Sequence, residues 1–259
     1  MYLDTSNVSF SRNDINRHIR LPDMLTEELA EDIGFHLGDG YAGDYSTKAN
    51  PHKYELTYSG HAIDDKRYFI EMLQNRKLNL FNIKPRITIR NNSIKASILS
   101  KALLTYFRDV IGVVCGNKLN AGVPTIIIES NKSIKSAFLR GLFDADGCIT
   151  FLKKHKDINY YPSIRIGLAS KSIIEGIKPM LLEFGIKYTS FSKIPFGHIG
   201  KRQSCIDING KENLEKWINL IGFNNYKHIA KYKIWKAFGF CPPKLNVEQY
   251  EKILESKQN

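Results

Sequence analysis

The chain has little of what marks exported, zinc-bound or membrane-spanning proteins. Its four cysteines, Cys115, Cys148, Cys205 and Cys241, are widely scattered, and none belongs to a C-x-x-C pair, which argues against a structural zinc site. No apolar stretch is long enough to span a membrane, and the N-terminus lacks the apolar core of a signal peptide. The sequence therefore predicts an intracellular protein (cytoplasm, nucleoid or organelle matrix) with no membrane partner, whose thiols are reduced and buried.

Acidic residues are scarce relative to basic ones. There are 38 Lys and Arg residues against 26 Asp and Glu residues, which gives a formal net charge of +12. This excess favours a polyanionic partner, and without membrane features that partner is predicted to be nucleic acid. A basic protein with no functional polyanion is the alternative. The length allows either one large domain or two small ones.

The most informative feature is an internal repeat, in which residues 26–40 match residues 133–147 at a constant offset. Each copy is predicted to be a helix that begins at a hydroxyl N-cap, Thr26 or Ser133, and ends just before a glycine, Gly40 or Gly147. Residues four apart share one helix face, so small residues at that spacing predict two closely packed helices. These small residues are Ala30, Gly34 and Gly38 in the first copy and Ala137, Gly141 and Ala145 in the second.

The order of predicted elements also repeats, as helix, two strands, helix, two strands, helix. The predicted strands are 41–46, 54–58, 85–90 and 94–99, then 149–154, 163–168, 188–194 and 203–208. The predicted helices after each copy are 65–79 and 101–112, then 172–184, 211–222 and 226–238. The fold class is therefore α+β, with a loosely packed basic arm (1–24), a first half (25–129), a second half (130–241) and a C-terminal helix and tail (242–259). Two copies suggest pseudo-two-fold symmetry, which suits duplex DNA.

Basic and polar residues alternate with apolar ones along several of these strands. An antiparallel sheet can bury one face and expose the other, and a β-ribbon fits the major groove. A merely solvated sheet face is the alternative for any single residue. The DNA-contact candidates are Arg86, Thr88, Arg90, Lys153, Arg165, Lys193, Lys201 and Arg202.

Both repeated helices are predicted to end in an aspartate, Asp39 in one and Asp146 in the other. A carboxylate there opposes the negative end of the helix dipole, and close packing of the helices adds like-charge repulsion. A divalent cation with oxygen ligands relieves both costs, so these residues, with Gly38 and Ala145, are the predicted metal set. At a basic surface such a site predicts metal-assisted phosphodiester hydrolysis. Asp-Gly as an ordinary helix stop is the competing interpretation.

The second copy, LRGLFDADG (Leu139 to Gly147), closely resembles the nonapeptide of the LAGLIDADG homing endonucleases. The first copy, DIGFHLGDG (Asp32 to Gly40), is looser and departs at Asp32, His36 and Leu37. The resemblance covers roughly residues 25 to 240. It implies a monomer of two pseudo-symmetric halves that pack through the motif helices and grip double-stranded DNA with two saddle-like sheets.

The resemblance also implies a mechanism and assigns residues to it. Asp39 and Asp146 would bind Mg²⁺, for which Mn²⁺ would substitute, and both DNA strands would be cut with a stagger. The family places a basic residue, usually Lys, near each scissile phosphate late in each half, and Lys118 and Lys227 are the candidates. His61 and Lys171 are weaker candidates for ordering solvent.

Two other functions remain open on the same fold. One is an intron maturase that binds intron RNA, and the other is a DNA-binding regulator that does not cut. The presence of both acids favours cleavage. An intein-embedded nuclease is disfavoured, because the chain starts at Met1 and its Gln258-Asn259 ending is not the usual His-Asn.

Overall fold

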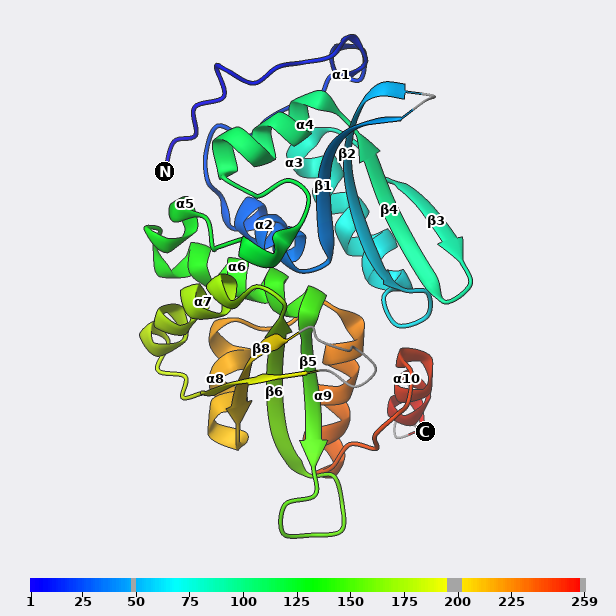
Figure 1. Ribbon diagram of the computed structural model, residues 1–259. Helices are drawn as coiled ribbons and strands as arrows, with labels where there is room; N and C mark the ends of the chain where they lie inside the picture. The colour runs from blue at the N-terminus through cyan, green and yellow to red at the C-terminus, as the bar shows by residue number, and fades with distance from the viewer. Residues whose placement is uncertain (48–49, 195–201, 257–259) are drawn as a thin grey trace.

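The computed structural model describes residues 1–47, 50–194 and 202–256, which form two halves built on the same plan (Figure 1). Each half has a four-stranded antiparallel sheet, with strand orders β1-β2-β4-β3 and β5-β6-β8-β7. The strands are β1 (Gly40–Thr47), β2 (Asn50–His61), β3 (Arg86–Arg90), β4 (Ser93–Leu99), β5 (Gly147–Leu152), β6 (Tyr161–Leu168), β7 (Thr189–Lys193) and β8 (Gln203–Asn209). The predicted α+β class and the repeated order are confirmed.

The helices lie between and behind the sheets. They are α1 (Arg12–Asn16), α2 (Glu27–Asp39), α3 (Gln74–Phe81), α4 (Lys101–Thr105), α5 (Thr125–Ile128), α6 (Lys132–Asp146), α7 (Lys171–Glu183), α8 (Lys211–Leu220), α9 (Tyr226–Phe238) and α10 (Val247–Glu255). Two helices of the first half contain π-helical segments, Tyr68–Leu73 and Tyr106–Ile111, which the sequence pattern did not predict. The 3₁₀ turn Lys118–Asn120 was also not predicted. In the described part of the chain, no helix combines the length and apolarity needed to cross a bilayer.

Each sheet buries one face against helices and leaves the other open. In β4, Ile94, Ala96 and Ile98 are buried, while the residues between them point to the open face. Helix α4 packs on β2, and helices α7, α8 and α9 pack on the second sheet. The alternation that predicted these strands thus has the expected cause, a half-buried antiparallel sheet.

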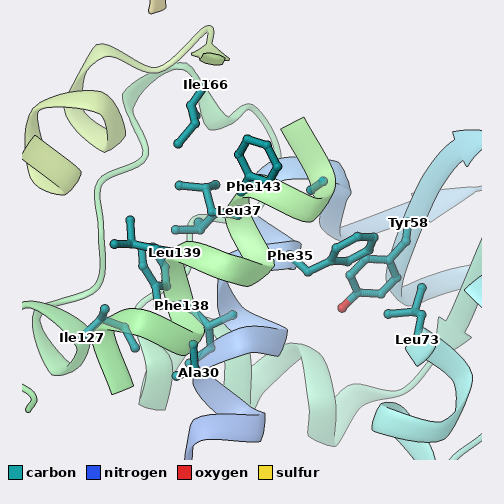
Figure 2. Close-up of a cluster of buried hydrophobic side chains, with 14 of the residues drawn as sticks. Ala30, Phe35, Leu37, Tyr58, Leu73, Ile127, Phe138, Leu139, Phe143 and Ile166 are labelled. Carbon is teal, nitrogen blue, oxygen red and sulfur yellow. The ribbon is translucent and has the colours of Figure 1, made fainter. Parts of the chain in front are cut away.

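The two halves meet through α2 and α6, which cross at the centre of the molecule (Figure 1). A Cβ atom added at Gly34 would overlap the carbonyl oxygen of Phe138, and one added at Gly141 would overlap that of Glu31. Ala30 and Ala137 are fully buried in the same contact. Figure 2 shows the apolar side chains that surround the crossing. The prediction that the halves pack through the motif helices is confirmed, because only small residues permit this backbone approach.

The ends of these helices differ in part from the prediction. Thr26 caps α2 by accepting the N–H of Leu29 at 3.2 Å, as expected. In α6 the N-cap is Asn131, whose side chain accepts the N–H of Ile134 at 3.1 Å, so the prediction of Ser133 was wrong. An amide side chain does the same work as a hydroxyl at this position.

The glycines that follow the two motif helices also have an unexpected role. Gly40 and Gly147 have φ values of −81° and −85°, so neither adopts the left-handed conformation of a typical helix-ending glycine. A Cβ at Gly40 would instead strike His36, and one at Gly147 would strike the ring of Phe143. Glycine is required here for space, because each chain turns directly from the helix into a strand.

The N-terminal segment is packed, not loose as predicted. Leu3 and Ile19 are buried in the core, and the buried carboxylate of Asp14 accepts the N–H of Ala102 at 3.1 Å. Arg17 donates to the carbonyl of Leu99. These contacts tie the segment to α4 and β4, and apolar residues scattered in a polar stretch were too few to predict them.

The thiols are free, as predicted, but not uniformly buried. Cys205 and Cys241 are buried, while Cys115 and Cys148 are only partly covered. Cys205 lies on a strand position that points towards the open sheet face, where neighbouring side chains cover it.

Candidate active site

The acids that end α2 and α6 lie next to one another. Asp146 Oδ2 lies 3.2 Å from the position that a Cβ on Gly38 would occupy, which places it beside the end of the opposite helix. Asp39 is half-buried and Asp146 is exposed, although both are surrounded by much of the protein. Burial, then Asp146 and then Asp65, raise the pKa of Asp39. Burial also raises the pKa of Asp146, against the opposing effect of the two nearby lysines.

Lys118 reaches this pair from the 3₁₀ turn that follows the first sheet. Its ammonium donates to the carbonyl of Leu37 at 2.9 Å and, more closely, to that of Gly38. The last carbonyls of a helix lack partners within the helix, so the lysine caps the C-terminus of α2 and offsets its dipole. Burial lowers the pKa of Lys118, while Asp146 and Asp39 oppose that effect. The same contact occupies the carbonyl of Gly38, which was predicted as part of the metal set.

Lys227 reaches the pair from the first turn of α9 in the second half. Its ammonium lies 2.8 Å from Oδ1 of Asp65, a residue of the first half that the sequence prediction missed. Burial lowers the pKa of Lys227, but Asp65 and Asp39 outweigh it, so the pKa is raised overall. The two lysines therefore lie by the same acids but have different partners.

The first aspartate of the second motif, Asp144, fixes the start of α9. Its buried carboxylate accepts the backbone N–H groups of Asn224 and Asn225 at 2.9 and 3.0 Å. Burial raises the pKa of Asp144 to about 7, which these donors partly oppose. In the first motif the equivalent position is Leu37, whose side chain cannot accept such hydrogen bonds.

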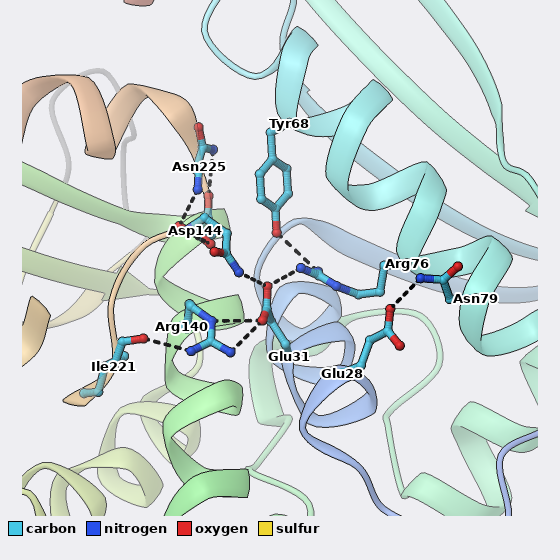
Figure 3. Close-up of polar contacts among 10 residues, drawn as sticks. Glu28, Glu31, Tyr68, Arg76, Asn79, Arg140, Asp144, Ile221 and Asn225 are labelled. Atoms are coloured by element: carbon cyan, nitrogen blue, oxygen red, sulfur yellow. Dashed lines mark hydrogen bonds and ion pairs between the residues drawn. The ribbon is translucent and has the colours of Figure 1, made fainter. Parts of the chain in front are cut away.

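A buried ionic network joins the halves beside the crossing helices (Figure 3). Glu31 of α2 lies 2.9 Å from the guanidinium of Arg140 on α6 and also pairs closely with Arg76. The carboxylate oxygen that pairs with Arg76 also accepts the side-chain amide of Asn224 at 2.7 Å, while the other oxygen pairs with Arg140. A buried carboxylate needs several such partners, and here they come from both halves. The network fixes the relative position of the helices that end in the two acids.

Asp32 and His36, two of the residues at which the first motif differs from the family pattern, belong to a buried polar cluster within the first half. Asp32 pairs with Lys77 at 2.7 Å, and Lys77 also donates to the hydroxyl of Tyr58. Nδ1 of His36 lies 3.1 Å from that hydroxyl, and the His36 ring packs on Phe107 with centroids 4.9 Å apart. Burial, then Lys77 and Lys118, lower the pKa of His36 well below its usual range. These polar residues have a structural role in the core and do not face the acids.

The predicted DNA-contact residues lie in different parts of the two sheets. Arg86, Thr88 and Arg90 lie on the open face of the first sheet, beside Ser97, Lys95 and Ser93 of β4. Lys193 lies on the open face of the second sheet, opposite Gln203. Arg202 is exposed just before β8, and Lys201 lies outside the described residues.

Two further candidates have settings that the sequence did not predict. Lys153 is exposed just beyond the end of β5, and its DNA contact stays a prediction. Arg165 does lie on the open face, but its guanidinium is held by two 2.6 Å contacts to Asp207. A single strand does not reveal which residue lies opposite in the next strand, so the sequence could not predict this pairing.

The open faces also carry an acid that was missed. Glu55 of β2 is buried among Tyr45, Lys53 and Lys95, with Lys53 at 2.9 Å and Lys95 at 3.9 Å. These partners lower the pKa of the Glu55 carboxyl despite its burial. The face is therefore a mixed polar surface and is not uniformly basic.

The two solvent-ordering candidates lie at the ends of strands. His61 ends β2, and its ring lies 3.3 Å from the carboxylate of Asp64. Lys171 is the exposed first residue of α7, after the N-cap Ser170. Neither role is tested by these contacts, and both remain predictions.

The donor set at the acids fits a hard divalent cation. Two carboxylates meet beside two lysines, and in the described residues no group of three His, Cys, Asp or Glu side chains could hold a metal by itself. Carboxylate oxygens suit Mg²⁺ or Mn²⁺, and Mg²⁺ commonly keeps waters and substrate phosphate as its other ligands. The raised pKa values of Asp39 and Asp146 mean that their ionised forms are destabilised in the metal-free protein, and a bound cation would stabilise those forms.

The family comparison agrees with this architecture. Residues 133–222 match the model of the LAGLIDADG-like domain. Among solved structures, that of I-DmoI in complex with DNA and Ca aligns over 80% of this chain and 97% of its own, at 18% identity and a TM-score of 0.56. That of I-SmaMI bound to uncleaveable DNA aligns over 81% and 89%, at 11% identity and a TM-score of 0.51.

Curated relatives contain only a matching segment. A glutamine–fructose-6-phosphate aminotransferase of Methanocaldococcus jannaschii is 29% identical over 82% of this chain, which spans 18% of that protein. A replication factor C small subunit of the same organism is 30% identical over 79% of this chain, which spans 10% of it. A tRNA-splicing ligase RtcB of Methanopyrus kandleri is 22% identical over 90% of this chain, which spans 24% of it.

Two pseudo-symmetric α+β halves, joined by motif helices that end in paired acids, define the class of fold to which this chain belongs. Residues 133–222 match the LAGLIDADG-like domain, and the chain shares the fold of the homing endonuclease I-DmoI.

Proposed function

We propose that this protein is a site-specific DNA endonuclease that hydrolyses both strands of a long duplex target and leaves a staggered break. The observation that carries the proposal is the pair of acids, Asp39 and Asp146, at the ends of two interlocked helices. A fold selected only for stability would not place two carboxylates together at the negative ends of helices. Such a placement has a purpose if the acids bind cations.

In this proposal Asp39 and Asp146 hold Mg²⁺ or Mn²⁺, which when bound would activate water and stabilise the leaving oxygen. Lys118 and Lys227 supply positive charge beside the two scissile phosphates. Both are fixed by hydrogen bonds at the site, so little reorganisation is needed when charge develops.

The open sheet faces are the proposed DNA-contact surfaces. Arg86, Arg90, Lys193 and Arg202 can contact phosphates or base edges, while Arg165 would present a guanidinium already oriented by Asp207. Phosphate contacts set position and base contacts set specificity. The net charge of +12 supports double-stranded DNA as the partner.

The comparisons lend support of two kinds. I-DmoI, which shares this fold, has been solved with DNA and Mn and with DNA and Ca. The same segment also occurs within longer proteins of unrelated activities, which fits a mobile element that homes as a unit. We propose that the chain acts as a monomer, because both acids and both lysines come from one chain.

The test is a cleavage selection on duplexes with a randomised central segment, in Mg²⁺ and at low salt. Wild-type protein should enrich one target and yield linear product, while Asp146→Asn should bind that target without cutting either strand efficiently. Cleavage by Asp146→Asn at the wild-type rate would refute the assignment. Binding of a duplex without cutting by the wild type would instead indicate a regulator, and selective binding of intron RNA would indicate a maturase.

A further inference from the structure

The two active-site lysines are bound in unequal ways. Lys227 lies 2.8 Å from a carboxylate oxygen of Asp65, across the boundary between the halves. Lys118 donates to the backbone carbonyls of Leu37 and Gly38, and no carboxylate of the described residues lies within ion-pair distance of it. A carbonyl leaves the ammonium with its full charge, whereas an adjacent carboxylate both fixes and partly neutralises it.

The Asp65 carboxylate accepts hydrogen bonds from both halves of the molecule. Asp65 is only 6% exposed and lies just after β2. One oxygen accepts the backbone N–H of His61 at 2.8 Å, and the other accepts the side-chain amide of Asn225 at 2.9 Å. Its carboxylate is therefore held by the first half while it holds Lys227 of the second half.

Asn225, which donates to Asp65, is itself held by Asp144. Asn225 is the N-cap of α9, and its backbone N–H and side-chain amide both bond Asp144. Lys227 lies two residues further along, so its position depends on Asp144 through the backbone and on Asp65 through its ammonium. In the second half, the N-cap of α7 is Ser170, whose hydroxyl donates to the carbonyl of Ala121.

We propose that Asp65 is a positioning residue that holds Lys227 beside one of the two scissile phosphates. Cutting of that DNA strand then depends on the Asp65 contact, whereas cutting of the other strand depends on Lys118, which is held by backbone carbonyls. The proposal rests on the proposed endonuclease function. Asp65 acts through Lys227, and the cut assisted by Lys118 does not use it. Loss of Asp65 should therefore slow one strand and spare the other.

The test uses the full chain, Mg²⁺ and a selected duplex target labelled differently on each strand. Lys227→Met first identifies the strand that Lys227 serves. Asp65→Ala should slow cutting of that strand by about tenfold to a hundredfold, since misplacement of a catalytic group costs about that much. The other strand should be cut at the wild-type rate, so nicked duplex should accumulate. Asp65→Asn, which keeps the volume and one oxygen, should show a smaller effect and guards against a misfolded alanine variant.

Two comparisons separate positioning from a general loss of stability. The double variant Asp65→Ala with Lys227→Met should cut the affected strand no more slowly than Lys227→Met alone, because both changes remove the same contribution. Asp14→Ala, which removes a buried carboxylate far along the chain from the site, should not slow one strand selectively.

Several results would overturn the proposal. These are equal slowing of both strands by Asp65→Ala, no slowing of either strand, or an additive effect in the double variant. Wild-type protein that cuts neither strand would overturn the endonuclease assignment itself, and this proposal with it. Normal cutting by the wild type combined with symmetric cutting by Asp65→Ala would overturn only the role of Asp65.

Discussion

Replacing Asp39 by Asn should stabilise the metal-free protein while removing its activity. Burial and the neighbouring Asp146 and Asp65 raise the pKa of Asp39, so the folded state resists its ionisation. Each unit of such a rise corresponds to about 1.4 kcal/mol of destabilisation once the group is charged. The pKa of Asp39 is raised to about 8, but its carboxylate retains contact with solvent, and screening reduces the expected destabilisation to about 1.4 kcal/mol. Asparagine keeps the shape of the side chain and removes the charge.

The sign of the pH dependence follows from proton linkage. The pKa of Asp39 is higher in the folded state, so between the unfolded and folded values the folded state binds more protons than the unfolded chain. Stability of the wild type therefore falls as pH rises through this window. The advantage of Asp39→Asn should be absent near the ordinary value of 3.8 and complete at pH values above the raised one.

The assay is thermal unfolding in a chelator across this pH range. At alkaline pH the variant should melt about 3–6 °C higher than the wild type, since about 1 kcal/mol shifts the melting temperature of a chain of this size by roughly 2–4 °C. Added Mg²⁺ should raise the melting temperature of the wild type more than that of the variant, because the cation binds the folded wild-type site.

A charge-matched control is Asp157→Asn, which removes an exposed carboxylate from the loop between β5 and β6. This control should leave the melting temperature nearly unchanged. If Asp39→Asn instead lowers the melting temperature, or if its effect does not change with pH, the acids are not a strained pair and the functional argument loses its basis.

Two further predictions concern packing and DNA binding. Gly141→Ala should destabilise the protein by about 1–3 kcal/mol or more, because its Cβ would overlap the carbonyl of Glu31, while Gly122→Ala, whose Cβ meets nothing within 4 Å, should be nearly neutral in the same denaturant titration. Equal effects of the two substitutions would contradict the close helix approach. DNA affinity should fall by about 10³–10⁵ between about 50 and 200 mM salt if six to ten phosphates are contacted, and salt-insensitive binding in a filter or anisotropy assay would argue against that surface.

The sequence alone predicted the features that depend on short stretches of chain. The alternation in 85–90 predicted a strand with one polar face, and small residues four apart in 30–38 and 137–145 predicted two tightly packed helices. Because both helices end in an aspartate, the repeat also predicted that Asp39 and Asp146 would meet. These inferences need only local periodicity and the symmetry of the repeat.

The errors came from features that periodicity does not encode. The cap of α6 is Asn131 and not Ser133, because either side chain can accept the same N–H and the helix began earlier than expected. The strand predicted over 149–154 ends at Leu152 in the structure. Strand ends and helix ends depend on hydrogen bonds whose competing local alternatives are close in energy.

Only the tertiary structure decided how the charged groups around the acids are paired. Asp65 and Lys227 lie in different halves and still make a 2.8 Å contact, and Arg165 meets Asp207 across two strands. Such pairs are set by the docking of the halves and by sheet register. The sequence thus determined that two acids would lie together. The packing of the halves determined that Lys227 pairs with a carboxylate and Lys118 with backbone carbonyls, because the partner of a charged side chain depends on which residues the fold places beside it.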